Sequence, residues 1–403
     1  MTSDAHADVA IVGAGIGGLA AAIALALAGR RVRVYEQAPV LGEVGAGLSI
    51  TPNAVKGLDW LGVGEDLREL ADRPPRMVTR HFRTGEVLID IDRADTVARY
   101  GAPYLQMHRA DLHALLLARV RTLDADAVQA GCALVAVEDH AAAGDGGDHG
   151  GAPLRLRFTD GPSATADALV GADGARSIVR SRVFGADAPR FAGYVAWRGL
   201  VPFDALGERI PRQGSSVSAG PGRLFVRYPV RRGTLLNFVA FARQAEWAPE
   251  GWSQLGRIAD VRAALADFHD EVHAILAAVP DGRCHQWGLF AREPLPRWVA
   301  GRVALLGDAA HPMLPWFGQG AASAIEDAVL LGRAARASAT LVEAFHRYEL
   351  ARHARVTLVH RESAAGGERL AGLHPEKLSN ATMQNEDTLG LFVYDPATAP
   401  LAG

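Results

Sequence analysis

Apolar residues in the first part of the chain follow the spacing of a strand, a helix and a second strand. The short apolar run Val9–Val12 predicts a buried strand, Ile16–Ala28 a helix, and Arg31–Tyr35 a second strand that ends before an acidic residue. A further helix is expected over about Ala110–Val120, because its leucines and valine recur on one helical face. Other short runs predict strands at Ala133–Val137, Leu154–Phe158 and Ala168–Val170.

The middle of the chain has a different pattern. Three strand-like runs, Gly193–Val201, Leu224–Pro229 and Thr234–Ala242, are separated by Gly, Pro and Arg turns, which predicts an antiparallel sheet. Helical spacing over Ile258–Val279 predicts one long helix. Strand, loop and helix patterns then return, and a last helix is expected over Leu341–His360. This order implies an α/β nucleotide-binding domain that is interrupted by a mostly β insertion.

Composition and charge narrow the possible partners. The 403-residue chain is 49% hydrophobic, has a net charge of −3 and scatters its basic residues, so we expect no nucleic-acid partner. Cys132 and Cys284 form neither a disulfide framework nor a zinc spacing, which favours a cytoplasmic setting and no metal site. The apolar run Val9–Gly29 could cross a bilayer, but its glycines favour a buried strand, loop and helix, and we expect no membrane span.

A glycine loop, GAGIGG, connects the first strand to the first helix. Gly13 permits a tight turn, the amides of Ala14 and Gly15 can approach a pyrophosphate, and Gly18 allows the helix to pack closely on the strand. The positive end of the helix favours a phosphate, and a carboxylate at the position of Glu36 can bind ribose hydroxyls. The loop predicts a dinucleotide site but does not distinguish NAD from FAD.

A second glycine loop lies far along the chain, in Gly307–Ala328. Prolines in this stretch keep the backbone extended, and its glycines allow close approach to a ligand. Glu326 and Asp327 are expected to be helix-surface or supporting acids, and His311 is not expected to act as a base. A turn with Asp308 precedes Pro312 and Pro315, and the loop Gly318–Gly320, which includes Gln319, opens a helix-like segment at Ala321.

These segments resemble the flavoprotein aromatic hydroxylases, which are single-component FAD monooxygenases of the salicylate, 6-hydroxynicotinate and urate hydroxylase type. The resemblance extends to GAGLSITPN at 45–53, HRADL at 108–112, LVGADGARS at 169–177 and GYVAWRG at 193–199. It implies a Rossmann-type, glutathione-reductase-like FAD-binding domain that is interrupted by a mostly antiparallel β substrate domain and followed by C-terminal helices. The expected division assigns 1–75, 101–185 and 291–340 to FAD binding, 76–100 and 186–290 to the substrate domain, and 341–403 to the helix and tail.

The resemblance also implies roles in holding FAD. The glycines of the first loop would hold the pyrophosphate, and Glu36 the adenosine ribose. Arg109 would contact the phosphate or ribityl region, and Asp173 would lie near the pyrophosphate and the path of the nicotinamide donor. Asp308 would bind ribityl hydroxyls, and the second glycine loop would border the isoalloxazine ring. As alternatives, Arg109 could be an exposed helix residue and Asp308 an ordinary cap.

By the same resemblance, NADH or NADPH reduces FAD, and a flavin C4a-hydroperoxide then hydroxylates a small aromatic or heteroaromatic substrate with O2. The chain has one dinucleotide loop, which fits a nicotinamide co-substrate that binds transiently. Hydroxylases of the 6-hydroxynicotinate type carry histidine where this chain has Ser49, and a histidine and tyrosine where it has Arg223 and Arg227. Arginine is a poor proton acceptor, so no catalytic base is predicted.

The candidate catalytic residues are Arg198, Arg223 and Tyr228. Strand alternation puts Arg198 on the same face as Tyr194 and Ala196, and Arg198 would lie in the site if this face meets the flavin. A solvated surface arginine is the alternative.

Other functions remain possible at this stage. An FAD oxidase or dehydrogenase would use the same cofactor without oxygenating a substrate, and a flavin-binding protein could lack turnover. A plain NAD dehydrogenase would leave Gly307–Ala328 without a purpose. We expect a monomer or homodimer.

Overall fold

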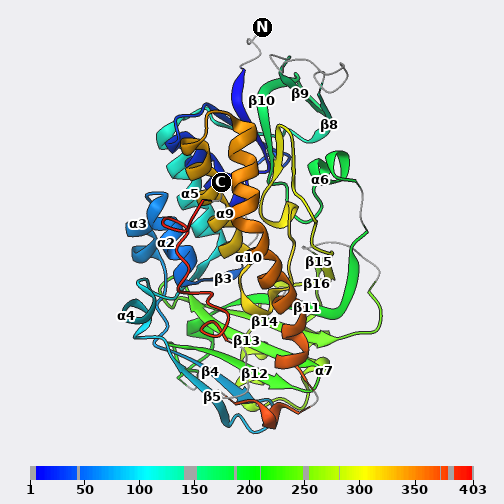
Figure 1. Ribbon diagram of the computed structural model, residues 1–403. Helices are drawn as coiled ribbons and strands as arrows, with labels where there is room; N and C mark the ends of the chain where they lie inside the picture. Colours follow the sequence, from blue (N-terminus) through cyan, green and yellow to red (C-terminus); the bar gives the residue numbers. More distant parts are fainter. Residues whose placement is uncertain are drawn as a thin grey trace.

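The computed structural model describes residues 6–42, 46–139, 152–185, 188–208, 210–247, 254–280, 282–372, 374–379 and 385–401. Two sheets form its framework, one in each half of the molecule (Figure 1). The sequence has a glycine-rich segment over 141–153, and its residues 141–151 lie outside the described residues.

The first sheet carries the glycine loop. Its main path runs β17-β18-β10-β1-β2-β7, in which β18, β10, β1, β2 and β7 are parallel to their neighbours; β8 and β9 extend it from β10 as antiparallel strands. The strands are β1 (Ala7–Val12), β2 (Val32–Glu36), β7 (Val128–Ala130), β8 (Leu134–Glu138), β9 (Leu154–Phe158), β10 (Ala164–Gly171), β17 (Val299–Ala300) and β18 (Val303–Leu305).

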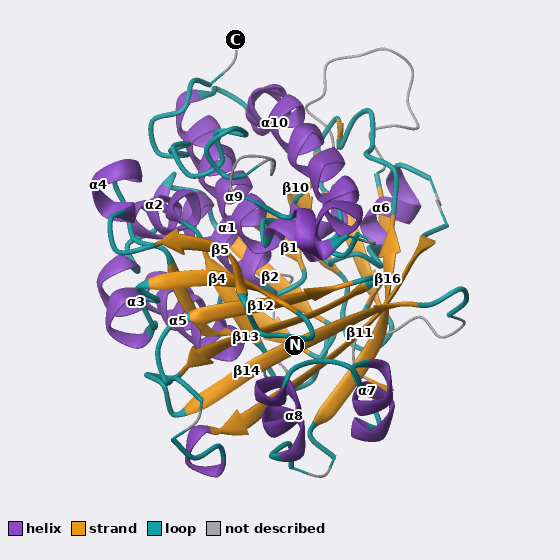
Figure 2. Ribbon diagram, turned by 90° about the horizontal axis from the view of Figure 1, so that it is seen from below, coloured by secondary structure: helices purple, strands orange, loops and turns teal. Residues whose placement is uncertain are grey.

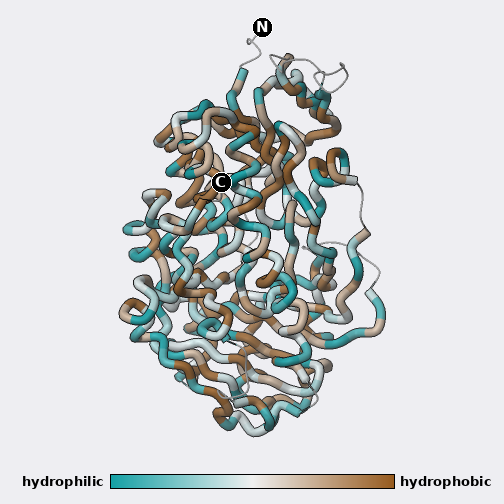
Figure 3. Tube along the Cα trace, in the orientation of Figure 1, coloured by the Kyte–Doolittle hydropathy of each residue, from teal (hydrophilic) through white to brown (hydrophobic). Residues whose placement is uncertain are grey.

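Helices cover this sheet and bury its apolar strands. The helix after β1 is apolar on nearly all sides because it is enclosed by the sheet and by other helices. Hydrophobic segments run through the interior of this half (Figure 3). The α-helices of the described residues, in both halves of the molecule, are α1 (Ile16–Leu27), α2 (Pro52–Trp60), α3 (Gly64–Leu70), α4 (Thr96–Tyr100), α5 (Arg109–Leu123), α6 (Ile178–Val183), α7 (Ile258–Ala264), α8 (Asp270–Ala277), α9 (Gly320–Ala337) and α10 (Leu341–Leu370). No helix among the described residues is long and apolar enough to cross a membrane.

The second sheet runs β15-β16-β11-β14-β13-β12-β4-β5 and is antiparallel except where β12 pairs with β4. Alternation gives it an outer face, which α7 and α8 cover (Figure 2), and an inner face, which meets the loop after β18. Its strands are β4 (Arg76–His81), β5 (Val87–Asp92), β11 (Arg190–Pro202), β12 (Ser215–Gly220), β13 (Arg223–Val230), β14 (Leu235–Arg243), β15 (Gln254–Leu255) and β16 (Cys284–Ala291). A separate two-stranded sheet joins β3 (Gly47–Ile50) to β6 (Leu105–His108).

Two helix predictions need correction. The single helix expected over Ile258–Val279 is divided into α7 and α8. Between them, the ring of Phe268 packs 5.5 Å from that of Phe82, and the backbone N–H of His269 donates to Phe82 O. These contacts with the sheet interrupt the helical hydrogen bonds. The last helix, α10, ends at Leu370, ten residues beyond its expected end at His360.

Candidate active site

The first glycine loop is sterically closed on one side and open on the other. Gly13 has φ +101°, and a Cβ there would lie 2.4 Å from Ala172 O; a Cβ on Gly18 would lie 2.0 Å from Gly13 O. Nothing lies within 4 Å of the equivalent position on Gly15, the N-cap of α1, and no side chain caps that helix. Uncapped N–H groups beside open space suit an anion, as the sequence predicts.

Glu36 ends β2 beside this loop. One carboxylate oxygen accepts a hydrogen bond from Ala14 N at 2.8 Å, and the other accepts from Ala38 N at 2.9 Å. The acid therefore fixes the shape of the loop, and its position next to Ala14 is compatible with the ribose role.

Asp173 follows β10, which lies parallel to β1 with Gly171 opposite Val12. Its carboxylate accepts hydrogen bonds from Ser177 Oγ at 2.5 Å and Ile178 N at 2.7 Å. Burial raises the pKa of Asp173, and these hydrogen bonds offset part of the rise. The side chain is thus engaged at the start of α6, close to the first glycine loop.

Asp308 lies in the short 3₁₀ turn η3 (Gly307–Ala309) after β18. Burial raises the pKa of Asp308, while electrostatic attraction to His311 and Arg109 opposes that rise. The fold thus brings Arg109, at the start of α5, near Asp308, although they are far apart in the sequence. A cleft of about 110 Å³ beside Asp308 is also lined by Arg176, Trp287 and Arg292, together with Met313, Leu314 and Pro315.

The second glycine loop runs from η4 (Pro315–Phe317) into α9. Gly318 has φ +62°, and nothing lies within 4 Å of a Cβ built there; the position built on Gly320 has Asp308 Oδ1 at 3.9 Å. The Gln319 side chain is buried and turns away, accepting from Asn53 Nδ2 at 3.0 Å and donating to Thr51 Oγ1 at 3.3 Å. Gln319 can therefore offer a ligand only its backbone.

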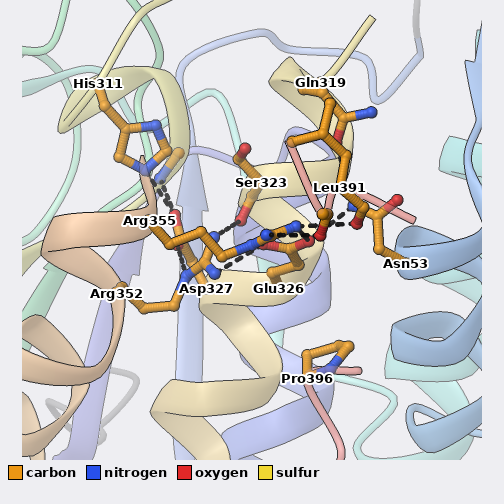
Figure 4. Close-up of polar contacts among 12 residues, drawn as sticks. Asn53, His311, Gln319, Ser323, Glu326, Asp327, Arg352, Arg355, Leu391 and Pro396 are labelled. Atoms are coloured by element: carbon orange, nitrogen blue, oxygen red, sulfur yellow. Dashed lines mark hydrogen bonds and ion pairs between the residues drawn. The ribbon is translucent and has the colours of Figure 1, made fainter. Parts of the chain in front are cut away.

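A buried ionic network fixes this loop to the helices (Figure 4). Asp327 accepts from His311 Nε2 and from Arg352 Nε, both at 2.7 Å. Glu326 pairs with Arg352 at 2.6 Å and with Arg355 at 2.9 Å. The expectation that these acids might be helix-surface groups is wrong, because α10 places two arginines against them. The supporting role expected as the alternative agrees with the contacts.

Of the catalytic candidates, Arg223 is directed away from the loop. It lies on the outer face, where its guanidinium binds both carboxylate oxygens of Asp267 at 2.6 and 3.0 Å. Its neighbour Arg227 similarly pairs with Glu271 at 2.8 Å. Arg223 and Tyr228 were both expected to be catalytic, but residues an odd number of positions apart point to opposite faces of a strand. Arg223 is therefore withdrawn as a catalytic candidate.

Tyr228 and Arg198 are on the inner face. Tyr228 is buried against Gly47, where a Cβ would lie 2.5 Å from Tyr228 Cε2. Burial raises the pKa of Tyr228, and its neighbour Tyr104 adds to the rise. The guanidinium carbon of Arg198 lies 5.0 Å from the centroid of the Trp287 ring.

Next to Tyr228, a row of half-buried side chains crosses the inner face. Val217, Val226 and Val239 are opposite one another on β12, β13 and β14, and Arg198 continues the row on β11. We call Val217, Val226 and Val239 the valine row. A buried row with Phe241, which packs on Trp316 of the loop, lies on one side. The three valines are only partly buried in the middle of a sheet face, so they can contact an apolar ligand.

Asn237, which was not predicted from the sequence, lies beside the valine row. Asn237 pairs with Tyr228 across the sheet, and its Oδ1 accepts from Gly47 N at 2.7 Å. Ser49 forms a hydrogen bond with Tyr104. The GAG segment signalled that β3 is part of the site, but strand pairing was needed to identify its partners.

A family model described as FAD binding domain matches residues 6–363. The chain belongs to this FAD binding domain family. The 3-amino-4-hydroxybenzoate 2-monooxygenase PtmB3 of Streptomyces platensis is 39% identical, over 98% of this chain and 97% of the relative. The 6-hydroxynicotinate 3-monooxygenase of Bordetella bronchiseptica is 35% identical, over 98% and 96%. The 3-hydroxybenzoate 6-hydroxylase 1 of Aquipseudomonas alcaligenes is 34% identical, over 97% and 95%.

Solved structures of this FAD-binding family have the same architecture. Klebsiella pneumoniae HpxO complexed with FAD and uric acid is 31% identical, with a TM-score of 0.82 over 95% of this chain and 96% of that one. A salicylate hydroxylase substrate complex is 26% identical, with a TM-score of 0.77 over 99% of both chains. Together with the named relatives, these matches make the protein an FAD-dependent enzyme of the monooxygenase class.

The residues present fit FAD. The open space at Gly15 and the uncapped α1 suit its pyrophosphate, while the left-handed Gly318 and the adjoining amides leave room for a flat ring. Asp308 lies between the two loops, where a carboxylate can accept hydrogen bonds from hydroxyls. The sequence resemblance to FAD-dependent aromatic hydroxylases is confirmed.

Proposed function

We propose that this enzyme uses NADH or NADPH and O2 to hydroxylate a small aromatic or heteroaromatic acid that already carries a ring hydroxyl or amino group. When bound, FAD would supply the redox chemistry for hydride acceptance and O2 activation, and one oxygen atom of O2 would be added to the ring. The second oxygen leaves as water, so each turnover consumes one NAD(P)H, one O2 and one proton.

The observation that carries this proposal is the row of Val217, Val226, Val239 and Arg198, which faces the second glycine loop. A planar ring lying over the valines would bury apolar surface, and a carboxylate could pair with Arg198 at the end of the row. Acids of this kind are named in the three relatives described above.

For the cofactor, we propose that the amides of Ala14 and Gly15 hold the pyrophosphate, with Gly13 and Gly18 shaping the turn. Glu36 would bind the adenosine ribose. The second loop would hold the other end of FAD. There, Asp308 and Arg109 would contact the ribityl and phosphate groups, with Asp173 near the pyrophosphate; the backbone of Pro315, Gly318, Gln319, Gly320 and Ala321 would border the flavin ring.

The protein itself positions the substrate, excludes water and controls protons. Tyr228 stays protonated at neutral pH because burial raises its pKa, so it can donate a hydrogen bond but cannot serve as a base. The buried ring of Trp316 on the loop packs against Tyr194 and Phe241 of the inner face and limits the access of water there. The cleft between Arg176, Arg292 and Asp308 offers a path for the nicotinamide donor.

Oxygen incorporation tests this function. Purified protein with bound FAD would be screened for NADH and NADPH oxidation with hydroxybenzoates, aminohydroxybenzoates and hydroxynicotinates, and products formed under ¹⁸O2 would be weighed by mass spectrometry. We expect stimulated oxidation with one labelled oxygen per product. Substrate oxidation without label would instead identify an oxidase or dehydrogenase, and bound FAD that neither nicotinamide reduces would identify a protein without turnover.

A further inference from the structure

Asn237 has a buried amide side chain on the inner face of the second sheet. It lies in β14 opposite Tyr228 of β13, and its side chain is 0% exposed. Its sequence neighbours Leu236 and Phe238 point to the opposite face and pack in the outer core. The next residue along β14 on the inner face is Val239 of the valine row. Asn237 and Tyr228 therefore lie alongside the valine row, over which the proposed substrate would lie.

The hydrogen bonds of Asn237 are only half satisfied. Its Oδ1 accepts from Gly47 N at 2.7 Å, which identifies the other terminal atom as the NH2 group. This Nδ2 is buried and has no hydrogen-bond partner among the described residues. Buried polar groups are nearly always paired, so an unpaired donor beside the partly buried valine row points to an acceptor that the protein itself does not provide.

The surroundings of Asn237 define the chemistry of that acceptor. A Cβ on Gly47 would lie 2.8 Å from Asn237 Cγ and 2.5 Å from Tyr228 Cε2, so the backbone of β3 seals this end of the sheet. Tyr228 and Tyr104 both remain neutral phenols because burial raises their pKa values. Asn237 and Tyr228 lie alongside the valine row, and Arg198 lies at its β11 end. A ligand over the valines could therefore place an electron-rich oxygen near these neutral donors and a carboxylate near the guanidinium.

We propose that Asn237 orients the substrate by donating a hydrogen bond from Nδ2 to its ring oxygen, which is a phenol, phenolate or pyridone oxygen. This inference rests on the proposed function and makes it more specific. A donor at this oxygen stabilises its anionic form, which raises the electron density of the ring without a side-chain base. It also fixes which ring carbon faces the flavin.

The test compares the binding of hydroxybenzoates with that of benzoate, which lacks only the ring oxygen. Binding of 3-hydroxybenzoate, 4-hydroxybenzoate and benzoate to the FAD holoenzyme would be followed by the flavin absorbance change, in wild type, Asn237→Ala and Asn237→Asp. Ser218→Ala is the matched control, because Ser218 is a buried polar residue on the outer face of the same sheet. Each variant would first be checked for wild-type FAD content.

Wild type is expected to prefer at least one hydroxybenzoate over benzoate, and Asn237→Ala to lose at least about tenfold of that preference. Asn237→Asp keeps an acceptor for Gly47 N, and its preference should fall as rising pH ionises the new carboxyl, while Ser218→Ala keeps the wild-type preference. A purely structural role would weaken all ligands equally in Asn237→Ala and would overturn the inference, as would an unchanged preference. Wild type that binds no aromatic acid and oxidises no NAD(P)H with any would overturn the proposed function as well.

Discussion

Asp327 joins the second glycine loop to α10, and replacing it with asparagine isolates the contribution of its charge. The side chain is 0% exposed. Its Oδ2 accepts from His311 Nε2 at 2.7 Å and from Gly307 N at 3.1 Å, while Oδ1 accepts from Arg352 Nε at 2.7 Å. Asn has the same shape, but its NH2 group would face a donor on one side or the other.

The magnitude follows from the pKa of Asp327. Burial alone would raise it, but His311 and Arg352 lower it from 3.8 to about 2. At about 1.36 kcal/mol per pKa unit, this corresponds to about 2 kcal/mol of stability that the charged form supplies. Breaking a buried pair by removing one partner costs about 3–5 kcal/mol. Arg352 keeps its pair with Glu326 in the variant, so we expect a loss near the lower value, about 3 kcal/mol.

The assay is reversible urea unfolding of the FAD-saturated protein at pH 7, followed by flavin and tryptophan fluorescence. Because the folded-state pKa is lowered, the Asp327 contribution is complete above about pH 4 and is lost as pH falls toward 2. Asp327→Asn should lack this part of the acid limb. Glu343→Gln, which affects an exposed pair with Arg347 at 3.8 Å, is the control and should change stability by less than about 1 kcal/mol. If Asp327→Asn is no more costly than this control, the reasoning is refuted.

Three further substitutions test the site. Gly13→Ala should abolish FAD retention, because its Cβ would lie 2.4 Å from Ala172 O at a φ of +101°; normal flavin content in the purified variant would contradict the loop geometry. Arg198→Met should lower kcat/KM for an aromatic acid at least about tenfold but spare an uncharged amide analogue in steady-state assays; equal losses would argue against carboxylate pairing. Arg223→Met should lower stability by about 1 kcal/mol and leave kcat/KM near wild type, since Arg223 pairs with Asp267 on the outer face; a large kinetic loss would restore it as a catalytic candidate.

The fold contains features that a local pattern reveals and features that it does not. The strand, glycine loop and helix at Val9–Ala28 were predictable, because a tight turn, close packing and phosphate approach each require glycine at a fixed spacing. Three strands of the second sheet, β11, β13 and β14, were found from their β-rich runs and turns, whereas β4, β5, β12, β15 and β16 were not predicted. The helix break near Phe268 was not predictable, because contacts with a strand far away in the chain interrupt an otherwise continuous apolar spacing.

The sequence by itself identified the chain, through two glycine loops far apart along it, as a member of an FAD-binding family, and it limited the catalytic candidates to a few polar residues. Only the tertiary structure decided which of these face the site. Tyr228 and Arg198 lie on the inner face, Arg223 on the outer, and Asn237 entered only through its pairing with Tyr228. Alternation along a strand divides residues into two sets. Which set meets the second glycine loop depends on what packs against each face of the finished sheet.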